Sequence, residues 1–126
     1  MLADETLVAF LGTADSERAR AFYEDVLELP LVGDNPHLMT FQSGAARVAL
    51  QKLAGVTPPQ GTALNWHVRD LRATMRGLLA RGVVFERFEG MGQDELGVWT
   101  PEPGTGVAWF KDPDGNLLSL SGAGQH

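Results

Sequence analysis

The chain repeats one pattern of secondary structure, and this repeat limits the folds that it can adopt. In each half an apolar strand-like run leads into a helix that begins at an aspartate, first at Asp15 and again at Asp70. These aspartates lie 55 positions apart, and the same offset pairs Val8 with Ala63. Each half is predicted to contain one strand, one helix and three further strands. The sequence therefore indicates an internal duplication.

Both helices are predicted from the spacing of apolar side chains and from residues that favour helix ends. The apolar positions of the first helix are Ala19, Phe22, Tyr23, Val26 and Leu27. Those of the second helix are Leu71, Met75, Leu78 and Leu79. Asp15 or Ser16 can cap the first helix, and Pro30 stops it. Asp70 can cap the second helix, which Gly82 closes.

Strands are predicted where short apolar or β-branched runs lie between turns rich in Gly and Pro. In the first half these runs are residues 6–11, 38–41 and 47–53. In the second half they are residues 62–68, 83–88, 97–100, 107–111 and 116–120. The sequence Asp112-Pro113-Asp114-Gly115 favours a turn between the last two strands. Since no long linker separates module one (about 6–53) from module two (about 62–121), residues 1–126 are predicted to form a single domain.

Composition argues against several classes of function. The 126 residues include 10 Lys and Arg against 16 Asp and Glu, a net charge of −6, which disfavours nucleic acid as a partner. No apolar run approaches the roughly 18 residues needed to cross a bilayer, and the acidic N-terminus is unlike a secretory signal. A cytoplasmic protein without membrane partners is therefore expected. Because the sequence contains no cysteine, disulfides and zinc–thiolate sites are excluded.

Two motifs resemble a known superfamily. One is Ala19-Arg20-Ala21-Phe22-Tyr23-Glu24-Asp25-Val26-Leu27, and the other is Trp109-Phe110-Lys111-Asp112-Pro113-Asp114-Gly115-Asn116. With the duplication, they resemble the vicinal oxygen chelate superfamily, which includes glyoxalase I, extradiol dioxygenases, fosfomycin-resistance enzymes and bleomycin-resistance binding proteins. The resemblance covers about residues 7–121. It implies an α+β fold in which two tandem βαβββ modules form a cup-shaped mixed sheet, with the helices outside and a ligand within.

The alternation of side chains along a strand predicts which residues face the cup. In the first strand the helix-facing residues are Leu7, Ala9 and Leu11, and the cup-facing residues are Val8, Phe10 and Gly12. With the offset of 55, the second half places Leu64, Trp66 and Val68 toward the helix, and Ala63, Asn65 and His67 toward the cup.

The resemblance also implies positions for a divalent metal, which enzymes of the superfamily hold with His, Gln or Glu from the first and last strands of each module. The matching positions here are Val8, about Ala49, Ala63 and Ser119. Aliphatic side chains offer no donor atom, and a serine hydroxyl is a weak neutral ligand. His67 lies four positions beyond Ala63 and cannot simply replace it. The sequence therefore predicts neither a metal site nor another cofactor.

A cup without a metal must hold its ligand by apolar area, stacking and a few polar groups. The candidate ligand-binding residues are Phe10, Arg47, Gln51, Asn65, His67, Trp99, Trp109 and Ser119. Phe10 is expected in the wall of the cup, and Arg47 with Gln51 suits an anionic or amide-bearing ligand. The register of Trp99 and Trp109 stays open from sequence, so either can line the cup or cover its mouth.

These candidates also have purely structural interpretations. Arg47 can be a solvated residue at a sheet edge, and Asn65 or His67 can be satisfied by neighbouring polar groups. Trp66 belongs by alternation to the helix face, where core packing explains it. Residues 90–97 form either a flexible lid or rim, or an ordinary polar loop.

Three functions remain open from the sequence. The preferred one is a metal-free protein that binds a small organic molecule and, as superfamily members often do, associates as a homodimer. The alternative is a metal-dependent glyoxalase- or dioxygenase-type enzyme with an atypical site that uses His67 and carboxylates such as Glu95 or Glu102. The third is metal-free proton transfer, in which His67 would be the general base, so His67 is a weak catalytic candidate. His37 and His126 are expected at the surface.

Overall fold

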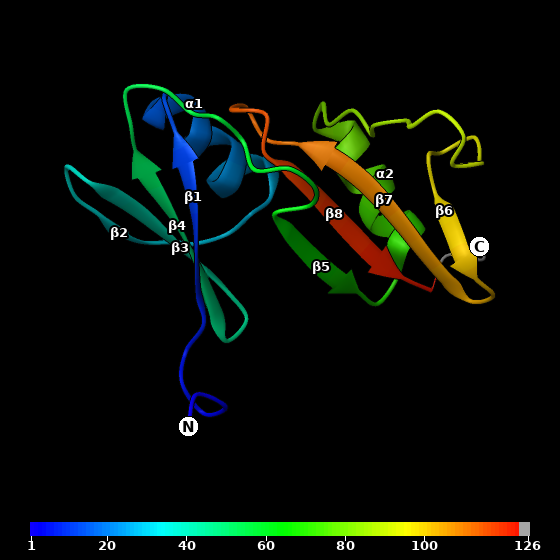
Figure 1. The fold of residues 1–126 in the computed structure, drawn as a ribbon, viewed down its shortest axis with the longest axis horizontal. Coiled ribbons are helices and arrows are strands. Elements are labelled where there is room, and N and C mark those ends of the chain that lie inside the picture. Colours follow the sequence, from blue (N-terminus) through cyan, green and yellow to red (C-terminus); the bar gives the residue numbers. More distant parts are fainter. Residues whose placement is uncertain (124–126) are drawn as a thin grey trace. The chain divides into compact units, whose positions relative to one another are not determined.

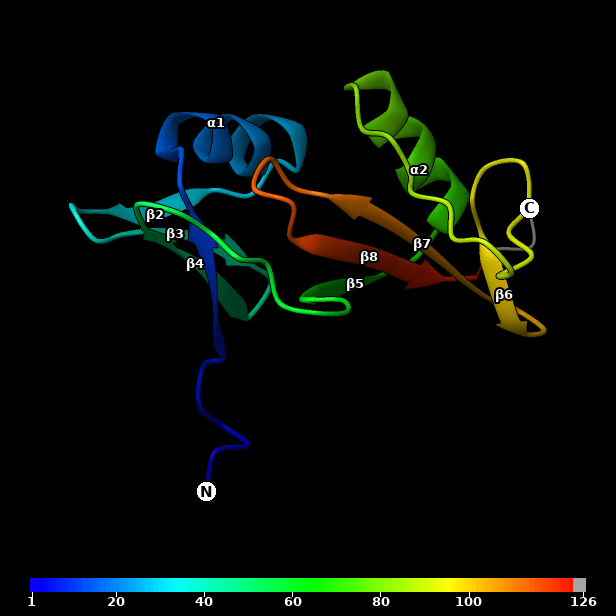
Figure 2. The same cartoon turned by 45° about the horizontal axis from the view of Figure 1, so that its top comes forward.

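The computed structural model describes residues 1–123, so His126 lies outside the described residues. The chain divides into two compact units, with the boundary between Pro58 and Pro59. Each unit holds one four-stranded mixed sheet with helical structure on one face (Figures 1 and 2). This is the predicted α+β architecture of two βαβββ modules. Among the described residues, none of the helices is both long enough and apolar enough to cross a membrane.

The first unit consists of a strand, a helical segment and three more strands. Its elements are β1 (Val8–Thr13), α1 (Ser16–Arg20), η1 (Ala21–Val26), β2 (Leu31–Asp34), β3 (Leu38–Ser43) and β4 (Ala46–Lys52). The sheet order is β1-β4-β3-β2. β1 runs parallel to β4, and the other neighbouring strands are antiparallel. The first helix is therefore the crossover that returns the chain to the sheet.

Asp15 is the cap of that helix, because its side chain accepts a hydrogen bond from the backbone N–H of Arg18 at 3.2 Å. The helix continues as a π-helix over Ala21–Val26, which sequence spacing alone did not distinguish from an α-helix. Tyr23 on this segment is fully buried and stacks on Phe41 of β3, with ring centroids 5.6 Å apart. This aromatic pair joins the helix to the sheet in the core of the unit.

The second unit repeats this order. Its elements are β5 (Leu64–Val68), α2 (Leu71–Ala80), β6 (Trp99–Glu102), β7 (Thr105–Lys111) and β8 (Leu117–Gly122). The sheet order is β5-β8-β7-β6, with β5 parallel to β8. Asp70 caps α2 through the backbone N–H of Ala73, and Gly82 follows the helix with a positive φ of 91°. The core between α2 and the sheet contains Leu71, Met75, Leu78, Phe110, Leu118 and Leu120.

The predicted strand at residues 83–88 is wrong. That segment forms only an isolated bridge between Phe85 and Phe110. The side chain of Gln93 donates to the carbonyl of Glu86 and accepts from the backbone N–H of Phe88. The N–H of Glu86 still donates to the carbonyl of Trp109 on β7, but with the other two groups taken by a side chain the contact does not extend into a ladder. The apolar pattern instead reflects Val83 and Phe85, which are buried in the core.

The duplication holds, but with two offsets. The offset of 55 relates Asp15 to Asp70, the two observed helix caps. The last strands follow a different offset: Ala9 pairs with Val48, and its counterpart Leu64 pairs with Leu118, which is 70 positions beyond Val48. Between these paired positions the second unit therefore contains 15 more residues than the first. Most of them lie in the long segment between α2 and β7.

Candidate functional site

The strand register gathers polar and aromatic side chains on the face of the second sheet that is turned away from α2. Asn65, Ser119 and Trp109 lie opposite one another on neighbouring strands. Two residues further along, the residues opposite one another are His67, Ser121, Val107 and Trp99. Directly paired residues point to the same side of a sheet. The neighbouring positions on β7 and β8, such as Ala108, Phe110, Leu118 and Leu120, are buried. We refer to this surface as the open face of the second sheet.

Hydrogen bonds connect the polar side chains of this face between β5 and β8. The Ser119 hydroxyl donates to Oδ1 of Asn65 at 2.7 Å. Nδ2 of Asn65 donates to the Ser121 hydroxyl at 3.1 Å, and Nδ1 of His67 lies 3.1 Å from the same hydroxyl oxygen. Ser119 is 3% exposed, whereas Asn65 and His67 are exposed. The four side chains form a continuous polar row that ends at an accessible imidazole.

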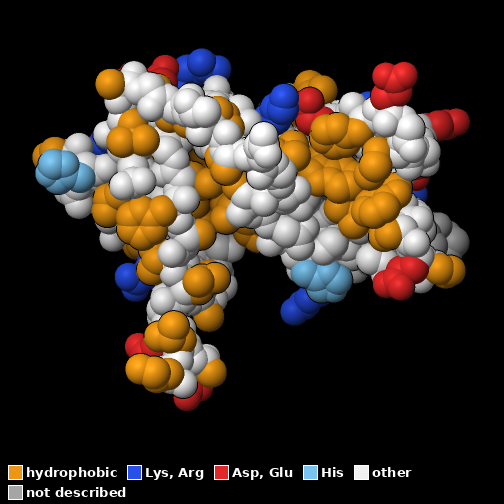
Figure 3. Space-filling view, in the orientation of Figure 1, with side chains coloured by type: hydrophobic (Ala, Val, Ile, Leu, Met, Phe, Trp, Pro, Cys, Tyr) orange, Lys and Arg blue, Asp and Glu red, His pale blue; other side chains and the backbone are white. Residues whose placement is uncertain are grey.

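Aromatic side chains occupy the other side of the open face. The rings of Trp99 and Trp109 are 5.8 Å apart and inclined at 33°, and Phe88 meets Trp109 edge-on at 5.4 Å. Nε1 of Trp109 donates to the Thr62 hydroxyl at 3.1 Å, which fixes the orientation of the indole. Figure 3 shows apolar side chains gathered over β7 in the view of Figure 1. The face thus combines a polar edge at β5 with an aromatic surface at β6 and β7.

The register resolves what sequence left open for both tryptophans. Trp109 is opposite Ser119, and Trp99 is opposite Val107, so both belong to the open face. Sequence reasoning did not nominate Ser121, although alternation from Ser119 along β8 places it on the same face. It also did not nominate Thr62, because a contact with Trp109, 47 positions away, has no local signal.

The remaining three predicted residues share the corresponding face of the first sheet. Phe10 is 55% exposed while its neighbour Leu11 is 7% exposed, which confirms the predicted alternation in β1. β4 places Arg47 opposite Val8, and Gln51 opposite Gly12. Both Arg47 and Gln51 are exposed, and Nε of Arg47 donates to Oε1 of Gln42 at 3.0 Å. These side chains form a second candidate surface.

The side chains at the four positions that would hold a metal do not suit a divalent cation. Val8, Ala49 and Ala63 are aliphatic, and the Ser119 hydroxyl is bonded to Asn65. Within residues 1–123, no three or more His, Cys, Asp or Glu side chains come together in a group that could hold a metal. A site for such an ion needs several N or O donors converging at about 2.0–2.5 Å.

The carboxylates considered for an atypical metal site do not join His67. Glu102 belongs to β6, which lies at the opposite edge of the sheet from β5. Glu95 lines a groove with Arg72 and Arg76 of α2. Three strand spacings, about 14 Å, separate β5 from β6. The structure therefore brings neither carboxylate to the imidazole.

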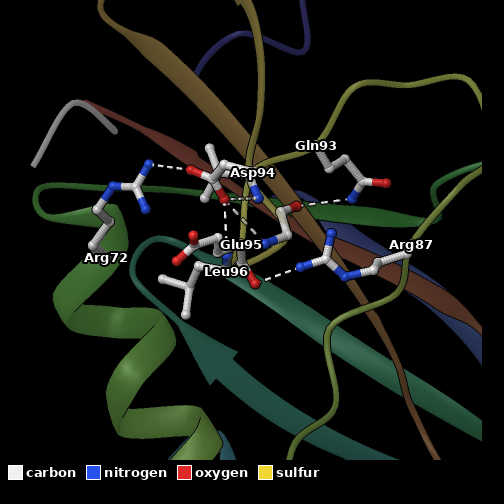
Figure 4. A network of polar contacts seen from close by, with 8 residues as sticks. Arg72, Arg87, Gln93, Asp94, Glu95 and Leu96 are labelled. Atoms are coloured by element: carbon white, nitrogen blue, oxygen red, sulfur yellow. Dashed lines mark hydrogen bonds and ion pairs between the residues drawn. The ribbon is translucent and has the colours of Figure 1, made fainter.

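A polar network holds the segment between α2 and β6 (Figure 4). Oδ1 of Asp94 accepts the backbone N–H groups of Leu96, Gly97 and Val98. Oδ2 of Asp94 pairs with Arg72 of α2 at 2.5 Å. Burial raises the pKa of Asp94, but the Arg72 and backbone hydrogen bonds outweigh it and hold the pKa below its usual value.

Gln93 and Arg87 add hydrogen bonds within the same segment. Gln93 donates to the carbonyls of Glu86 and Gly97, and Arg87 donates to the carbonyl of Glu95. These bonds cross-link residues 86–98 and favour an ordered polar loop over a flexible lid for residues 90–97.

The sequence matches one model of a protein family. The model described as the Glyoxalase/Bleomycin resistance protein/Dioxygenase superfamily matches residues 6–120, nearly the whole chain. No curated protein matches the sequence significantly.

Solved structures with the same fold include proteins of different activity. The chain resembles TnmS3, an antibiotic binding protein from Streptomyces sp. CB03234, with a TM-score of 0.71, 22% identity, and coverage of 95% of this chain and 96% of that one. It also resembles lactoylglutathione lyase from Agrobacterium tumefaciens, with a TM-score of 0.73, 19% identity, and coverage of 96% and 95%. At these identities the likeness establishes the fold alone.

Proposed function

Because the chain belongs to the glyoxalase/bleomycin resistance protein/dioxygenase superfamily, we propose that it binds a small organic molecule without a metal ion. The open face of the second sheet is the proposed binding surface. The activity is then sequestration of the bound molecule, with no covalent bond made or broken.

The observation that carries the proposal is the combination of groups on that face. Trp99 and Trp109 present adjacent indole rings, while Asn65 and His67 offer exposed hydrogen-bonding groups. Small-molecule sites typically combine apolar and aromatic lining with a few polar groups that fix orientation. The donor set described above does not suit a divalent cation, so affinity must come from stacking, apolar area and hydrogen bonds.

Two further features support the proposal. The first sheet carries a comparable surface with Phe10, Arg47 and Gln51, which together offer an aromatic ring, a cation and an amide. In addition, the fold is shared with a protein described as antibiotic binding. Since one fold hosts many activities, this second feature supports the choice of function less than the side chains do.

Tryptophan fluorescence tests the proposal directly. The purified protein is titrated with a panel of small aromatic compounds, and each mixture is then analysed for products. We expect at least one compound to give a saturable fluorescence change and to be recovered unchanged. Steady turnover without added metal would contradict binding as the sole activity, and the absence of any saturable response would contradict the proposed site.

Two matched variants locate the bound compound. Trp109→Phe removes the larger indole from the open face and is expected to weaken binding about tenfold, the equivalent of one aromatic contact. Trp66→Phe changes an indole that alternation places on the opposite face of β5, so it should leave the affinity unchanged. Equal weakening by the two variants would place the ligand elsewhere.

If a reaction is found, His67→Ala tests the proton-transfer alternative. A general base must lie within hydrogen-bond reach of the proton that it removes. Loss of turnover with retained binding would assign that role to His67, whereas unchanged turnover would exclude it.

A further inference from the structure

The direction of the hydrogen bonds along the polar row determines which groups remain for a ligand. The row runs from Ser119 through Asn65 and Ser121 to His67. A hydroxyl has one proton to donate, an amide nitrogen only donates, and a neutral imidazole has one donor and one acceptor nitrogen. These rules limit where each proton can lie.

The first link sets the orientation of the amide. The Ser119 hydroxyl donates to Oδ1 of Asn65 at 2.7 Å, a much shorter contact than its 3.5 Å distance to the carbonyl of Leu64. With its oxygen engaged, Asn65 turns its NH₂ group toward Ser121 and donates to the hydroxyl oxygen at 3.1 Å. The Ser121 oxygen is therefore an acceptor in this contact.

The second link sets the tautomer of the imidazole. The Ser121 oxygen can donate to Nδ1 of His67 at 3.1 Å or accept from it. Donation gives the hydroxyl proton a protein acceptor, which Asn65 cannot provide because its nitrogen is itself a donor. If Ser121 donates to Nδ1, then the proton of the neutral ring resides on Nε2. We propose that Ser121 holds His67 as an Nε2–H donor, and that His67 thereby selects ligands with a hydrogen-bond acceptor.

The same register suggests how such a ligand would lie. His67 and Ser121 are in register with Val107 and Trp99, and Trp109 lies two residues along β7 from Val107. Neighbouring strands are about 4.8 Å apart, so β7 lies about 10 Å from β5. A ligand that uses both ends of the face would stack a flat aromatic body on Trp109 and direct a carbonyl oxygen to Nε2 of His67. This assignment of ligand chemistry rests on the proposed function.

The tautomer is measurable without any ligand. Nitrogen-15 NMR of the histidine side chains, recorded at about pH 8, distinguishes Nδ1–H from Nε2–H. We expect His67 to be entirely Nε2–H. Ser121→Ala should introduce a mixture of tautomers, Ser121→Thr should preserve the Nε2–H form, and Ser121→Asp should reverse it, since a carboxylate can only accept. A predominantly Nδ1–H ring in the unaltered protein, or no reversal in Ser121→Asp, would overturn the proposal.

Selectivity is tested with two compounds of similar shape, 2-acetylnaphthalene and 2-ethylnaphthalene, of which only the first has an acceptor. We expect the ketone to bind about tenfold more tightly, the equivalent of one hydrogen bond. His67→Phe and Ser121→Asp should abolish this preference while the affinity for the hydrocarbon is retained. Equal binding of both compounds to the unaltered protein would refute the selectivity. If neither compound binds, that result would count against the proposed function. The NMR measurement would still decide the tautomer of His67.

Discussion

Asp94 is the residue on which the polar loop of the second unit depends. It accepts three backbone N–H groups and pairs with Arg72, and these contacts outweigh burial to hold its pKa below the usual value. The folded protein therefore favours the ionised form more than the unfolded chain does. Asp94 stabilises the fold above its unfolded pKa of about 3.9, and this contribution disappears as the pH falls through the lower, folded pKa.

We predict that Asp94→Asn destabilises the protein by about 1 kcal/mol near neutral pH, similar to the loss of a helix cap. The variant keeps one acceptor for the backbone but loses the charge opposite Arg72. Urea unfolding should show this difference at pH 7, and the two proteins should converge as the pH falls below about 4. Glu95→Gln is the control, because it removes one negative charge from the same loop at an exposed side chain. A difference that persists unchanged into acid would contradict the assignment.

For single residues, the sequence predicts the face of the strand on which a side chain lies better than it predicts the hydrogen-bond partner of that side chain. Alternation placed Phe10 and His67 correctly on the open faces, because the orientation of successive side chains is a local property of a strand. The contact between Ser121 and His67 and the bond from Trp109 to Thr62 join residues far apart in the chain. Such contacts depend on register, which no local pattern specifies.

At the scale of the element, the parallel pairing of β5 with β8 depends on Gly122. A Cβ atom added there would lie 2.5 Å from the carbonyl oxygen of Val68, a backbone atom that cannot move without disturbing the strand. The pairing matters for the site because it sets Ser119 opposite Asn65, and Ser121 opposite His67.

Gly122→Ala is therefore predicted to destabilise the protein by about 1–3 kcal/mol through overpacking. It should also disturb the signal of His67 in NMR spectra. Gly55→Ala is the matched control, because an added Cβ at that position meets no atom within 4 Å. Thermal unfolding of the two variants measures the difference, and equal melting temperatures would show that β5 and β8 tolerate the clash.

Elements with a conventional backbone were predictable, and the exceptions have physical causes. Asp70 and Gly82 mark the ends of α2 as expected, because the chemistry of caps is local. The π-helix over Ala21–Val26 has the same apolar residues as an α-helix, so spacing does not reveal it. Residues 83–88 have the composition of a strand, but Gln93 takes the carbonyl of Glu86 and the N–H of Phe88, so the contact with β7 does not extend into a ladder.

For the whole molecule, we expect a homodimer. The first sheet exposes Val8 at 39% and Phe10 at 55% on its open face, and burial of such apolar area favours association. Light scattering should therefore give twice the 13.6 kDa mass of the chain. Val8→Glu should shift the protein toward the monomer, whereas Val84→Glu, at an exposed position in the second unit, should not. A monomeric mass for the unaltered protein at micromolar concentration would contradict this expectation.

The duplicated architecture was predictable because the two halves carry matching strands, helices and caps. Membership of the superfamily follows from the family match over residues 6–120. The function required more than the fold, because the fold is shared by a lyase and by an antibiotic binding protein. Our proposal of metal-free binding therefore depends on the side chains at Val8, Ala49, Ala63 and Ser119, of which three are aliphatic and one is a weak neutral hydroxyl ligand.

The most direct test of metal-free binding uses a compound selected by fluorescence. Its affinity is measured by calorimetry on protein purified without chelator and again after treatment with EDTA. Elemental analysis of the same samples should find no stoichiometric zinc, nickel, iron or manganese, and the two dissociation constants should agree. A divalent ion retained at one per chain, together with binding that EDTA abolishes and the metal restores, would contradict metal-free binding.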